Sequence, residues 1–348
     1  MVSVREHTAQ HDDPEELPLL TESAEVAEIT ALDEDRTDEV HEAAERLLLE
    51  LGEEEFVLED GHPPTIDWDG VETVLEENDG PIVDRLSTVA DRYHRAYPSL
   101  LSIRLEEVDP EDSIGFLPGQ YLTLQFQDTP RPYSVASSPN WSYLEFCIRR
   151  VPGGRLTSDL FSDLESGDEV VLRGPNGDFV LEEPSDRDVA FLATGTGVAP
   201  LRSMIQYIFE EGMDVHGGES RDVWLFLGAS WKDDLAYREE FEELAAEHDN
   251  FHFVPTLSRE TYLTDWDGET DYVQHTVMKY LESPGDYDLD GKLGRALEAD
   301  PETDIEARLD PSTLEVYACG VTAMVSTLVD AVEKIGVPEE HIQGEGYG

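Results

Sequence analysis

A buried strand, a glycine-rich turn and a helix follow one another directly in residues 188–212, DVAFLATGTGVAPLRSMIQYIFEEG, and this succession constrains the fold most strongly. The strand is almost entirely apolar, which is typical of a strand covered on both faces of a parallel sheet. Apolar strands and amphipathic helices alternate again in 222–258 and in 312–336. We therefore expect a doubly wound parallel sheet over residues 187–348, with the acidic, turn-rich segment 281–310 as a surface insertion.

A second pattern occupies residues 99–186, where short strands rich in valine, leucine, tyrosine and phenylalanine are separated by turns. The turns contain glycine, proline, serine and asparagine, which favour tight reversals of the chain. Short strands at this spacing predict an antiparallel barrel. The expected strands are 100–108, 120–126, 143–150 and 168–175.

Residues 1–98 constrain the fold least. The first 35 or so residues are polar and acidic, and we expect them to be partly disordered. Helices are predicted at 36–51, where apolar side chains share one face, and at 81–98, which begins and ends with proline. The helices form either a small module that packs on the main body or a docking element for a partner. The sequence does not separate these two interpretations.

Acidic residues are spread along the whole chain rather than gathered in one tail. There are 80 aspartates and glutamates against 23 lysines and arginines, and the formal net charge is -57. This composition resembles that of cytosolic proteins from halophilic archaea, whose self-repulsion is screened by molar salt. The alternative is an acidic docking protein for a basic partner. Nucleic-acid binding is not expected, because phosphate contacts need clustered lysine and arginine.

The two cysteines, Cys147 and Cys319, are too few for a disulfide framework or an all-cysteine iron–sulfur cluster, and we expect no metal site. No apolar run reaches the roughly 18 residues of a membrane span. The N-terminal residues lack the apolar core of a signal peptide. We therefore expect a soluble, cytoplasmic protein.

Three glycine-containing turns are candidate ligand sites. Gly195 and Gly197 lie where a strand passes into a helix, and N–H groups at such a helix start favour a pyrophosphate. A tight turn without a ligand would need the same glycines. In 153–160, GGRLTSDL, hydroxyls and glycines precede a helix and could hold a phosphate or only cap the helix. Cys319-Gly320 ends another strand of the same sheet, although a lone buried cysteine is usually a core residue.

The order of the motifs along the chain resembles the ferredoxin–NADP reductase family over roughly residues 99–348. The most specific motif is RPYS, which spans Arg131 to Ser134. The motifs, in the family's order, are FLPGQYLTLQF, RPYSVASSP, GGRLTSDL, GPNGDF, TGTGVAPLRSM, CGVTAM and GEGYG. The resemblance implies an antiparallel FAD-binding barrel followed by an NAD(P)-binding domain.

The resemblance also implies roles on the flavin side of the site. Arg131 would pair with the flavin pyrophosphate, for which a bidentate guanidinium is suited. Tyr133 would pack on the isoalloxazine ring, and Ser134 would hydrogen-bond near its N5 as a catalytic group. The phosphates would be held by Gly154, Thr157 and Ser158. The next strand would line the flavin with Cys147, Ile148 and Arg149.

On the nicotinamide side, the resemblance implies a turn that faces the diphosphate and ribose. This turn comprises Thr194, Gly195, Thr196 and Gly197. The nicotinamide would lie against Cys319 and Gly320, the former as a catalytic group. Glu345 and Tyr347 match the family's C-terminal acid and aromatic residue, and a charged group there could relay a proton to reduced flavin. Simple packing is the alternative for both.

The choice of nucleotide depends on two short elements. A Ser-Arg pair and a Tyr-x-Gln element contact the 2′-phosphate of NADP in the family, and they correspond here to Ser258, Arg259, Tyr272 and Gln274. These matches favour NADP over NAD. However, Thr270 stands where the family has lysine, and Trp266 and Gly268 are similar to members that use NADH. A surface Arg259 without a specific role is the alternative.

We therefore expect a flavoprotein reductase that passes hydride from NAD(P)H to FAD and electrons on to ferredoxin or another small redox protein. The sequence carries no four-cysteine ferredoxin segment, so the expected partner is a separate chain. One alternative is an electron-transfer subunit of an oxygenase or hydrogenase complex that docks through its N-terminal helices. Another is a flavin-free binding protein that has kept only the fold.

Overall fold

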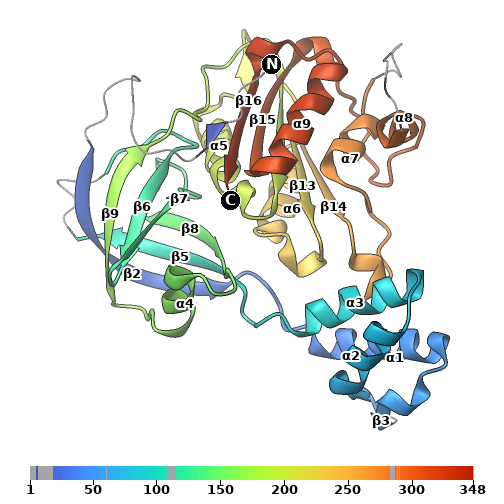
Figure 1. Ribbon diagram of the computed structural model, residues 1–348. Coiled ribbons are helices and arrows are strands. Elements are labelled where there is room, and N and C mark those ends of the chain that lie inside the picture. The colour runs from blue at the N-terminus through green and yellow to red at the C-terminus, as the bar shows by residue number, and fades with distance from the viewer. Residues whose placement is uncertain are drawn as a thin grey trace.

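The computed structural model describes residues 5–6, 19–59, 61–108, 114–282, 287, 289 and 291–347. Within these ranges the chain forms an antiparallel barrel, a parallel sheet covered by helices, and a helical module below both (Figure 1). Each unit buries an apolar core of its own, and the parallel sheet buries one on each face. The fold class expected from the sequence is confirmed.

The barrel consists of six antiparallel strands in the order β7-β6-β9-β2-β5-β8. An isolated bridge between Val135 and Phe146 joins the two edges, so the barrel is nearly closed. The short helix α4 (Arg155–Ser162) buries Leu156 and Leu160 in the barrel core. The strands are β2 (Leu20–Ala31), β5 (Leu100–Glu107), β6 (Tyr121–Phe126), β7 (Thr129–Ser134), β8 (Leu144–Arg149) and β9 (Glu169–Asn176).

Strand β2 corrects the expectation that the barrel begins at residue 99, because part of the acidic N-terminal segment belongs to the barrel. Leu20–Ala31 is a central barrel strand that pairs with both β5 and β9. Ala24 and Val26 point into the core, while the residues between and beside them are exposed. Glu25 and Glu28 therefore lie on the outer face of the strand, where water solvates them. Most of the first 18 residues lie outside the described ranges.

The parallel sheet has the strand order β1-β16-β15-β10-β13-β14. The chain moves outward from β10 in both directions, so a topological switch point lies between β10 and β15, where doubly wound sheets bind ligands. The strands are β1 (Arg5–Glu6), β10 (Asp188–Thr194), β13 (Val223–Ala229), β14 (Phe251–Leu257), β15 (Leu314–Val321) and β16 (Ile342–Tyr347).

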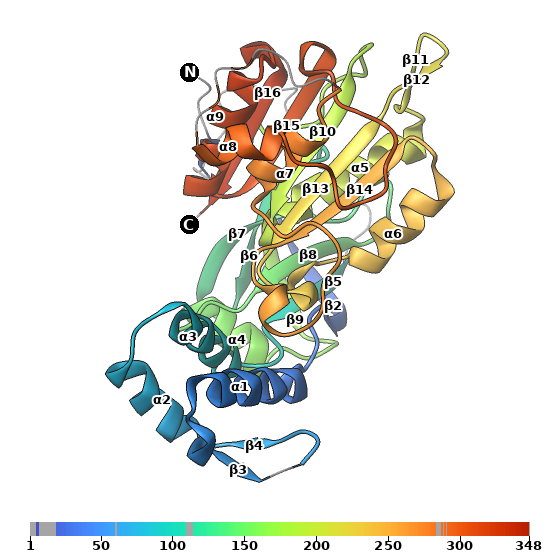
Figure 2. The ribbon, with the colours of Figure 1, turned by 90° about the vertical axis from the view of Figure 1, so that its right-hand side faces the viewer.

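Helices cover both faces of this sheet, as Figure 2 shows. One face packs against α5 (Val198–Glu211) and α6 (Arg238–Glu247). The other packs against α7 (Val273–Lys279), α8 (Gly291–Leu297) and α9 (Thr322–Lys334). Helix α8 belongs to segment 281–310, part of which lies outside the described ranges. The remaining short elements are β11 (Val215–His216), β12 (Glu219–Ser220), η6 (Pro311–Thr313) and η7 (Glu339–His341).

The helical module is an insertion between the neighbouring barrel strands β2 and β5. Its ends meet at a neck, where Leu32 N–H donates to Leu100 O and the Asp33 carboxylate accepts from the N–H and hydroxyl of Ser99. Helices were expected at 36–51 and 81–98, and the structure has them as α1 (Thr37–Leu51) and α3 (Pro81–Tyr93). The other elements are α2 (Trp68–Glu77), η1 (Glu54–Phe56), β3 (Val57–Glu59) and β4 (Thr65–Ile66).

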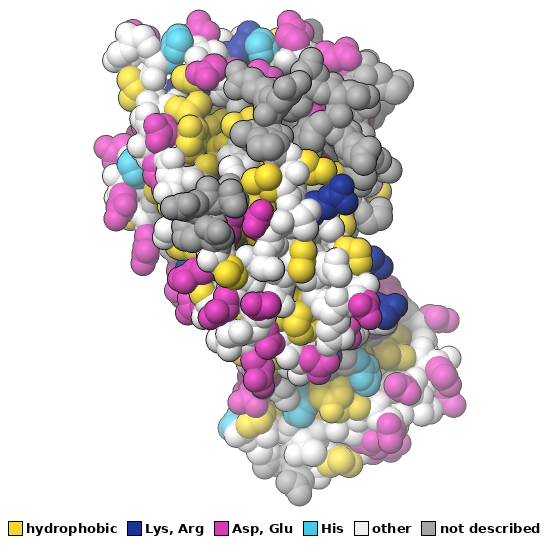
Figure 3. Space-filling view, turned by 90° about the vertical axis from the view of Figure 1, so that its left-hand side faces the viewer, with side chains coloured by type: hydrophobic (Ala, Val, Ile, Leu, Met, Phe, Trp, Pro, Cys, Tyr) yellow, Lys and Arg dark blue, Asp and Glu magenta, His cyan; other side chains and the backbone are white. Residues whose placement is uncertain are grey.

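The surface carries acid over all three units, as expected from the distribution in the sequence. Figure 3 shows carboxylates scattered over the barrel, the sheet domain and the module rather than gathered in one patch. No helix within the described ranges combines the length and the apolar character that crossing a membrane requires.

Candidate active site

The ends of β10 and β15 approach closely at the switch point. After Thr194 the chain turns through η3 (Gly195–Gly197), in which Gly195 has a φ of 54°, a left-handed value that favours glycine. A Cβ on Gly197 would lie 2.2 Å from the carbonyl oxygen of Cys319. Only glycine fits there, so the strand–helix turn of β10 lies directly against the end of β15. This contact lies directly beneath the site.

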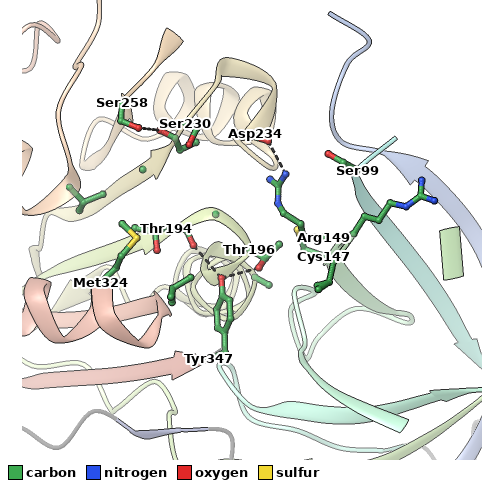
Figure 4. Close-up of a pocket in the computed structure, with 18 of the residues that line it drawn as sticks. Ser99, Cys147, Arg149, Thr194, Thr196, Ser230, Asp234, Ser258, Met324 and Tyr347 are labelled. Atoms are coloured by element: carbon green, nitrogen blue, oxygen red, sulfur yellow. Dashed lines mark hydrogen bonds and ion pairs between the residues drawn. The ribbon is translucent and has the colours of Figure 1, made fainter. Parts of the chain in front are cut away.

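A pocket of about 790 Å³ opens in front of this turn, between the barrel and the sheet (Figure 4). From the sheet domain it is lined by residues at the strand ends and directly before α7, which include Thr194, Thr196, Ser258, Arg259 and Tyr272. From the barrel it is lined by Tyr133, Ser134, Cys147 and Arg149. The structure thus brings together residues that the sequence analysis assigned separately to the flavin and to the nicotinamide nucleotide.

A second pocket of about 580 Å³ adjoins the first. It is lined by the predicted phosphate ligands Arg131, Gly154 and Thr157, and also by Arg155 and Thr322. The guanidinium of Arg131 donates to the carbonyl oxygen of Pro130 and is exposed. It forms no ion pair with any carboxylate in the described ranges. Its charge is therefore available to an anionic ligand.

The charges around the two pockets differ from those of the chain as a whole. Among the described residues, two arginines and no carboxylate line the smaller pocket. The larger is lined by four arginines and two aspartates, and both aspartates are engaged. Asp234 pairs with Arg149 at 2.9 Å and with Arg95 at 2.6 Å, while Asp271 is 2.6 Å from His275. In a chain of net charge -57, this arrangement selects for anionic ligands.

Two tyrosines form the wall that the pockets share. Tyr347 ends β16, and its hydroxyl is 2.9 Å from Thr196 Oγ1 and donates to Thr194 O at 3.3 Å (Figure 4). Tyr133 lies on β7, and burial raises the pKa of its phenol to about 12. Burial also raises the pKa of Tyr347. Both rings are therefore neutral at physiological pH and offer flat, uncharged surfaces to a planar ligand.

The residues at this site fit FAD and a nicotinamide nucleotide, each of which carries a diphosphate and a planar ring. The smaller pocket is cationic, and the hydroxyl oxygen of Thr322 on its wall is buried without a hydrogen-bond partner in the described part of the chain. The hydroxyl oxygen of Thr194, in the larger pocket, is likewise buried without a hydrogen-bond partner among the described residues. Because buried hydroxyls normally form hydrogen bonds, these two can bond to polar atoms of a bound ligand.

Seven of the residues named from the sequence do not line either pocket. They are Ile148, Ser158, Gly197, Gln274, Cys319, Gly320 and Glu345. Ile148 faces the barrel core, and Ser158 is exposed on α4. Cys319 and Glu345 are buried beneath the crevice, on the paired strands β15 and β16. A catalytic role for Cys319 or Glu345 remains a prediction.

The sequence analysis missed several residues on the pocket walls. Arg95 and Ser99 reach the larger pocket from the end of the inserted module, and Ser230 and Asp234 reach it from the loop after β13. No local motif marks these positions, because the chain brings them to the pocket only through tertiary packing. The sequence contained one indication. Ser230 comes at the end of a predicted buried strand, and parallel sheets bind ligands at the carboxyl ends of their strands.

Comparisons with known proteins match both domains. Residues 98–181 match the family described as the oxidoreductase FAD-binding domain, and residues 191–330 match the oxidoreductase NAD-binding domain. Ferredoxin–NADP reductase B of Sorangium cellulosum is 31% identical over 257 residues, which is 72% of this chain and 92% of that protein.

Two further relatives are longer than the matched region. Protein RfbI of Salmonella typhimurium is 33% identical over 52% of this chain and 52% of its own length. The phenol hydroxylase P5 protein of Acinetobacter pittii is 34% identical over 53% of this chain and 51% of its own length. The chain thus spans about half the length of these two relatives.

Among solved structures, the Amycolatopsis cytochrome P450 reductase GcoB has a similar fold. Its TM-score is 0.62 at 22% identity, and the match covers 96% of this chain and 72% of that one. A likeness at this identity concerns the fold alone.

Proposed function

Because the chain belongs to the ferredoxin–NADP reductase family of FAD- and NAD-binding oxidoreductases, we propose that it passes hydride from NADPH to bound FAD and electrons onward to a separate redox protein. One observation carries this proposal. Two anion-selecting pockets meet between the domains and share Tyr133 and Tyr347 as a common wall. Two nucleotides bound there would bring their rings together at that wall.

In the proposed arrangement, the smaller pocket holds the diphosphate of FAD. Arg131 neutralises its charge, and the N-terminus of α4 with Thr157 offers hydrogen-bond donors. Tyr133 packs against the isoalloxazine, and Ser134 offers a hydroxyl beside it. Bound flavin supplies the chemistry of accepting a hydride and releasing electrons singly. The chain supplies the alignment of the rings and an environment that excludes water.

The larger pocket holds the nicotinamide nucleotide. The turn after β10 presents N–H groups and the Thr194 and Thr196 hydroxyls to the diphosphate and ribose. At the far end, Ser258, Arg259 and Tyr272 line the wall where the adenosine would lie. Arg259 has no ion pair with a described residue, which leaves its charge for a 2′-phosphate. This supports NADP over NAD, although Asp271 nearby would suit the 2′-hydroxyl of NAD.

The electron acceptor is proposed to be a ferredoxin or the oxygenase component of a multi-component system. Relatives at about one-third identity include a ferredoxin–NADP reductase and a phenol hydroxylase protein, which support both classes. The scattered carboxylates and scarce lysines support a working environment of high salt inside the cell. At molar salt the Debye length falls to about 3 Å, so apolar contact rather than charge would guide docking.

Anaerobic stopped-flow reduction tests the proposal. The purified protein, reconstituted with FAD in molar KCl, should show bleaching of the flavin absorbance by NADPH, with slower reduction by NADH at equal concentration. Reoxidation by added ferredoxin or by an oxygenase component then identifies the class of acceptor. Failure of both nucleotides to bleach the flavin would rule out the reductase function, and faster bleaching by NADH would reverse the assignment of the nucleotide.

A further inference from the structure

The inserted helical module contacts the two loops that carry the outer wall of the larger pocket. These loops are residues 230–235, which follow β13 and contain η4 (Lys232–Asp234), and residues 258–264, which follow β14 and contain η5 (Glu260–Tyr262). Figures 1 and 2 both show α3 close to the end of the sheet from which they emerge. The pocket residues Ser230, Ser258 and Arg259 lie on these loops.

The first contact is a buried ion pair between Arg36 and Glu260. The two guanidinium nitrogens donate to Glu260 Oε1 at 2.8 Å and to Oε2 at 2.9 Å. Arg36 is 4% exposed and Glu260 is fully buried. The same carboxylate accepts from the N–H of Lys232 at 2.7 Å. Glu260 therefore ties both nucleotide loops to the start of the module, immediately beside Arg259 in the chain.

The second contact is a cluster of arginines and aspartates at the other end of the module. Arg92 donates to Asp233 at 2.8 Å, and Arg95 donates to Asp234 at 2.6 Å. The barrel residue Arg149 donates to Asp234 at 2.9 Å. Since burial penalises each charge, every partner here is needed to hold the others. The cluster thus joins the module, the barrel and the loop after β13 in one place.

Apolar packing and surface contacts complete the joint. Trp231 and Leu263, one from each loop, are buried in the module's own core together with Leu86 and Val71. On the surface, Arg46 of α1 donates to the carbonyl oxygens of Tyr262 and Leu263. The loops thus end inside the hydrophobic core of the module rather than resting against it.

We propose that the inserted module positions the nucleotide-binding loops, and that Glu260, held by Arg36, is a positioning residue for the contact of Arg259 with the 2′-phosphate. This inference rests on the proposed use of NADP. The Arg36 guanidinium also neutralises a carboxylate that would otherwise stand beside the phosphate-binding arginine. Small displacements of a binding group weaken a contact strongly, so loss of the pair should be visible in affinity.

Binding of adenosine 2′,5′-bisphosphate and of 5′-AMP to the FAD-loaded protein, measured by isothermal titration calorimetry, tests the proposal. Glu260→Gln keeps the size of the side chain and an acceptor for Lys232 N–H, but it removes the charge that faces Arg36. We expect the Kd for adenosine 2′,5′-bisphosphate to rise about tenfold and the Kd for 5′-AMP to rise less than threefold, with unchanged flavin content. Arg46→Gln, at the surface, should shift the same ratio in the same direction without endangering the fold.

The matched control is Val71→Ala, which opens a cavity in the module core but keeps every hydrogen bond and ion pair between the module and the two loops. It should lower Tm and leave the ratio of the two Kd values unchanged. An unchanged ratio in Glu260→Gln, or an equal change in Val71→Ala, would overturn the positioning role. If the wild-type protein binds both ligands with equal affinity, the proposal that the protein uses NADP is refuted instead. In that case ADP-ribose replaces the bisphosphate. The positioning role then requires that Glu260→Gln raise the Kd for ADP-ribose more than Val71→Ala does, and equal changes would overturn it.

Discussion

Replacing Arg131 with methionine tests the flavin site most directly. Methionine keeps the length and apolar stem of the side chain and removes the guanidinium that faces the smaller pocket. A hydrogen bond to a charged group contributes about 1.5–3 kcal/mol. Arg131 is exposed and shares its pocket with one other arginine, so we take a loss of about 2 kcal/mol. This corresponds to a rise of about thirtyfold in the Kd for FAD.

The assay is a titration of the apoprotein with FAD, followed by flavin fluorescence at fixed salt. Arg131→Lys keeps the charge but not the bidentate geometry, so its Kd should fall between those of wild type and methionine. The control is Arg173→Met on the outer face of β9, which changes the net charge equally but lies outside both pockets. A shift below threefold for Arg131→Met, or an equal shift for Arg173→Met, would refute the assignment of Arg131 to the diphosphate.

Four further predictions follow from the site. Arg259→Ala should raise KM for NADPH at least tenfold while KM for NADH changes less than twofold, and equal effects in steady-state kinetics would remove the case for a 2′-phosphate contact. Burial raises the pKa of Cys147 to about 12 and that of Cys319 well above its usual value, so native protein at pH 8 should resist a thiol reagent until denaturant exposes both. Because the unfolded chain loses the Cys147 proton first, the free energy of unfolding should fall as pH rises from about 9 toward 12, which urea titrations can measure. Gly197→Ala should weaken nucleotide binding and lower Tm, because its Cβ meets a backbone carbonyl of β15; full retention of both would contradict the close contact at the switch point.

The sequence predicted the sheet domain well because its signals are local. The apolar runs of β10, β13 and β15 and the glycines of the first turn depend on neighbouring residues only. The same holds for α1 and α3, whose apolar faces and prolines are visible at short range. Arg131 and Thr194, each within such a local motif, line the pockets, whereas Gly197 and Cys319 of similar motifs lie beneath them.

Strand β2 was missed because its alternating pattern is short and interrupted. Ala24 and Val26 face inward, but the register of pairing shifts between Val26 and Glu28, which breaks the two-residue period. The intervening glutamates then favour an interpretation as an acidic tail. The partner strand β5 is also separated from β2 in the sequence by the whole module, so no neighbouring residues indicate the pairing.

The joint between the module and the nucleotide loops could not be predicted for a different reason. The partners Arg36 and Glu260 lie 224 positions apart, and each is an ordinary charged residue in a chain rich in charge. Burial alone distinguishes this pair from the many exposed carboxylates. A single sequence contains no signal of such burial until the fold is known.

The neck at Asp33 and Ser99 has a consequence for how a chain of this kind can be shortened. The two strands that flank the module are already hydrogen-bonded partners up to the point of departure, with Ala31 opposite Leu101. Closing that gap with a two-residue hairpin would cost little chain entropy and would leave the barrel register intact. A minimal chain built in this way would lose the part of the larger pocket's wall that Arg95 and Ser99 provide. It would also leave Glu260 and Asp233 without their arginines, while Asp234 would keep Arg149 alone. Such a chain would need neutral residues in place of Glu260 and Asp233 before it could fold around its nucleotides.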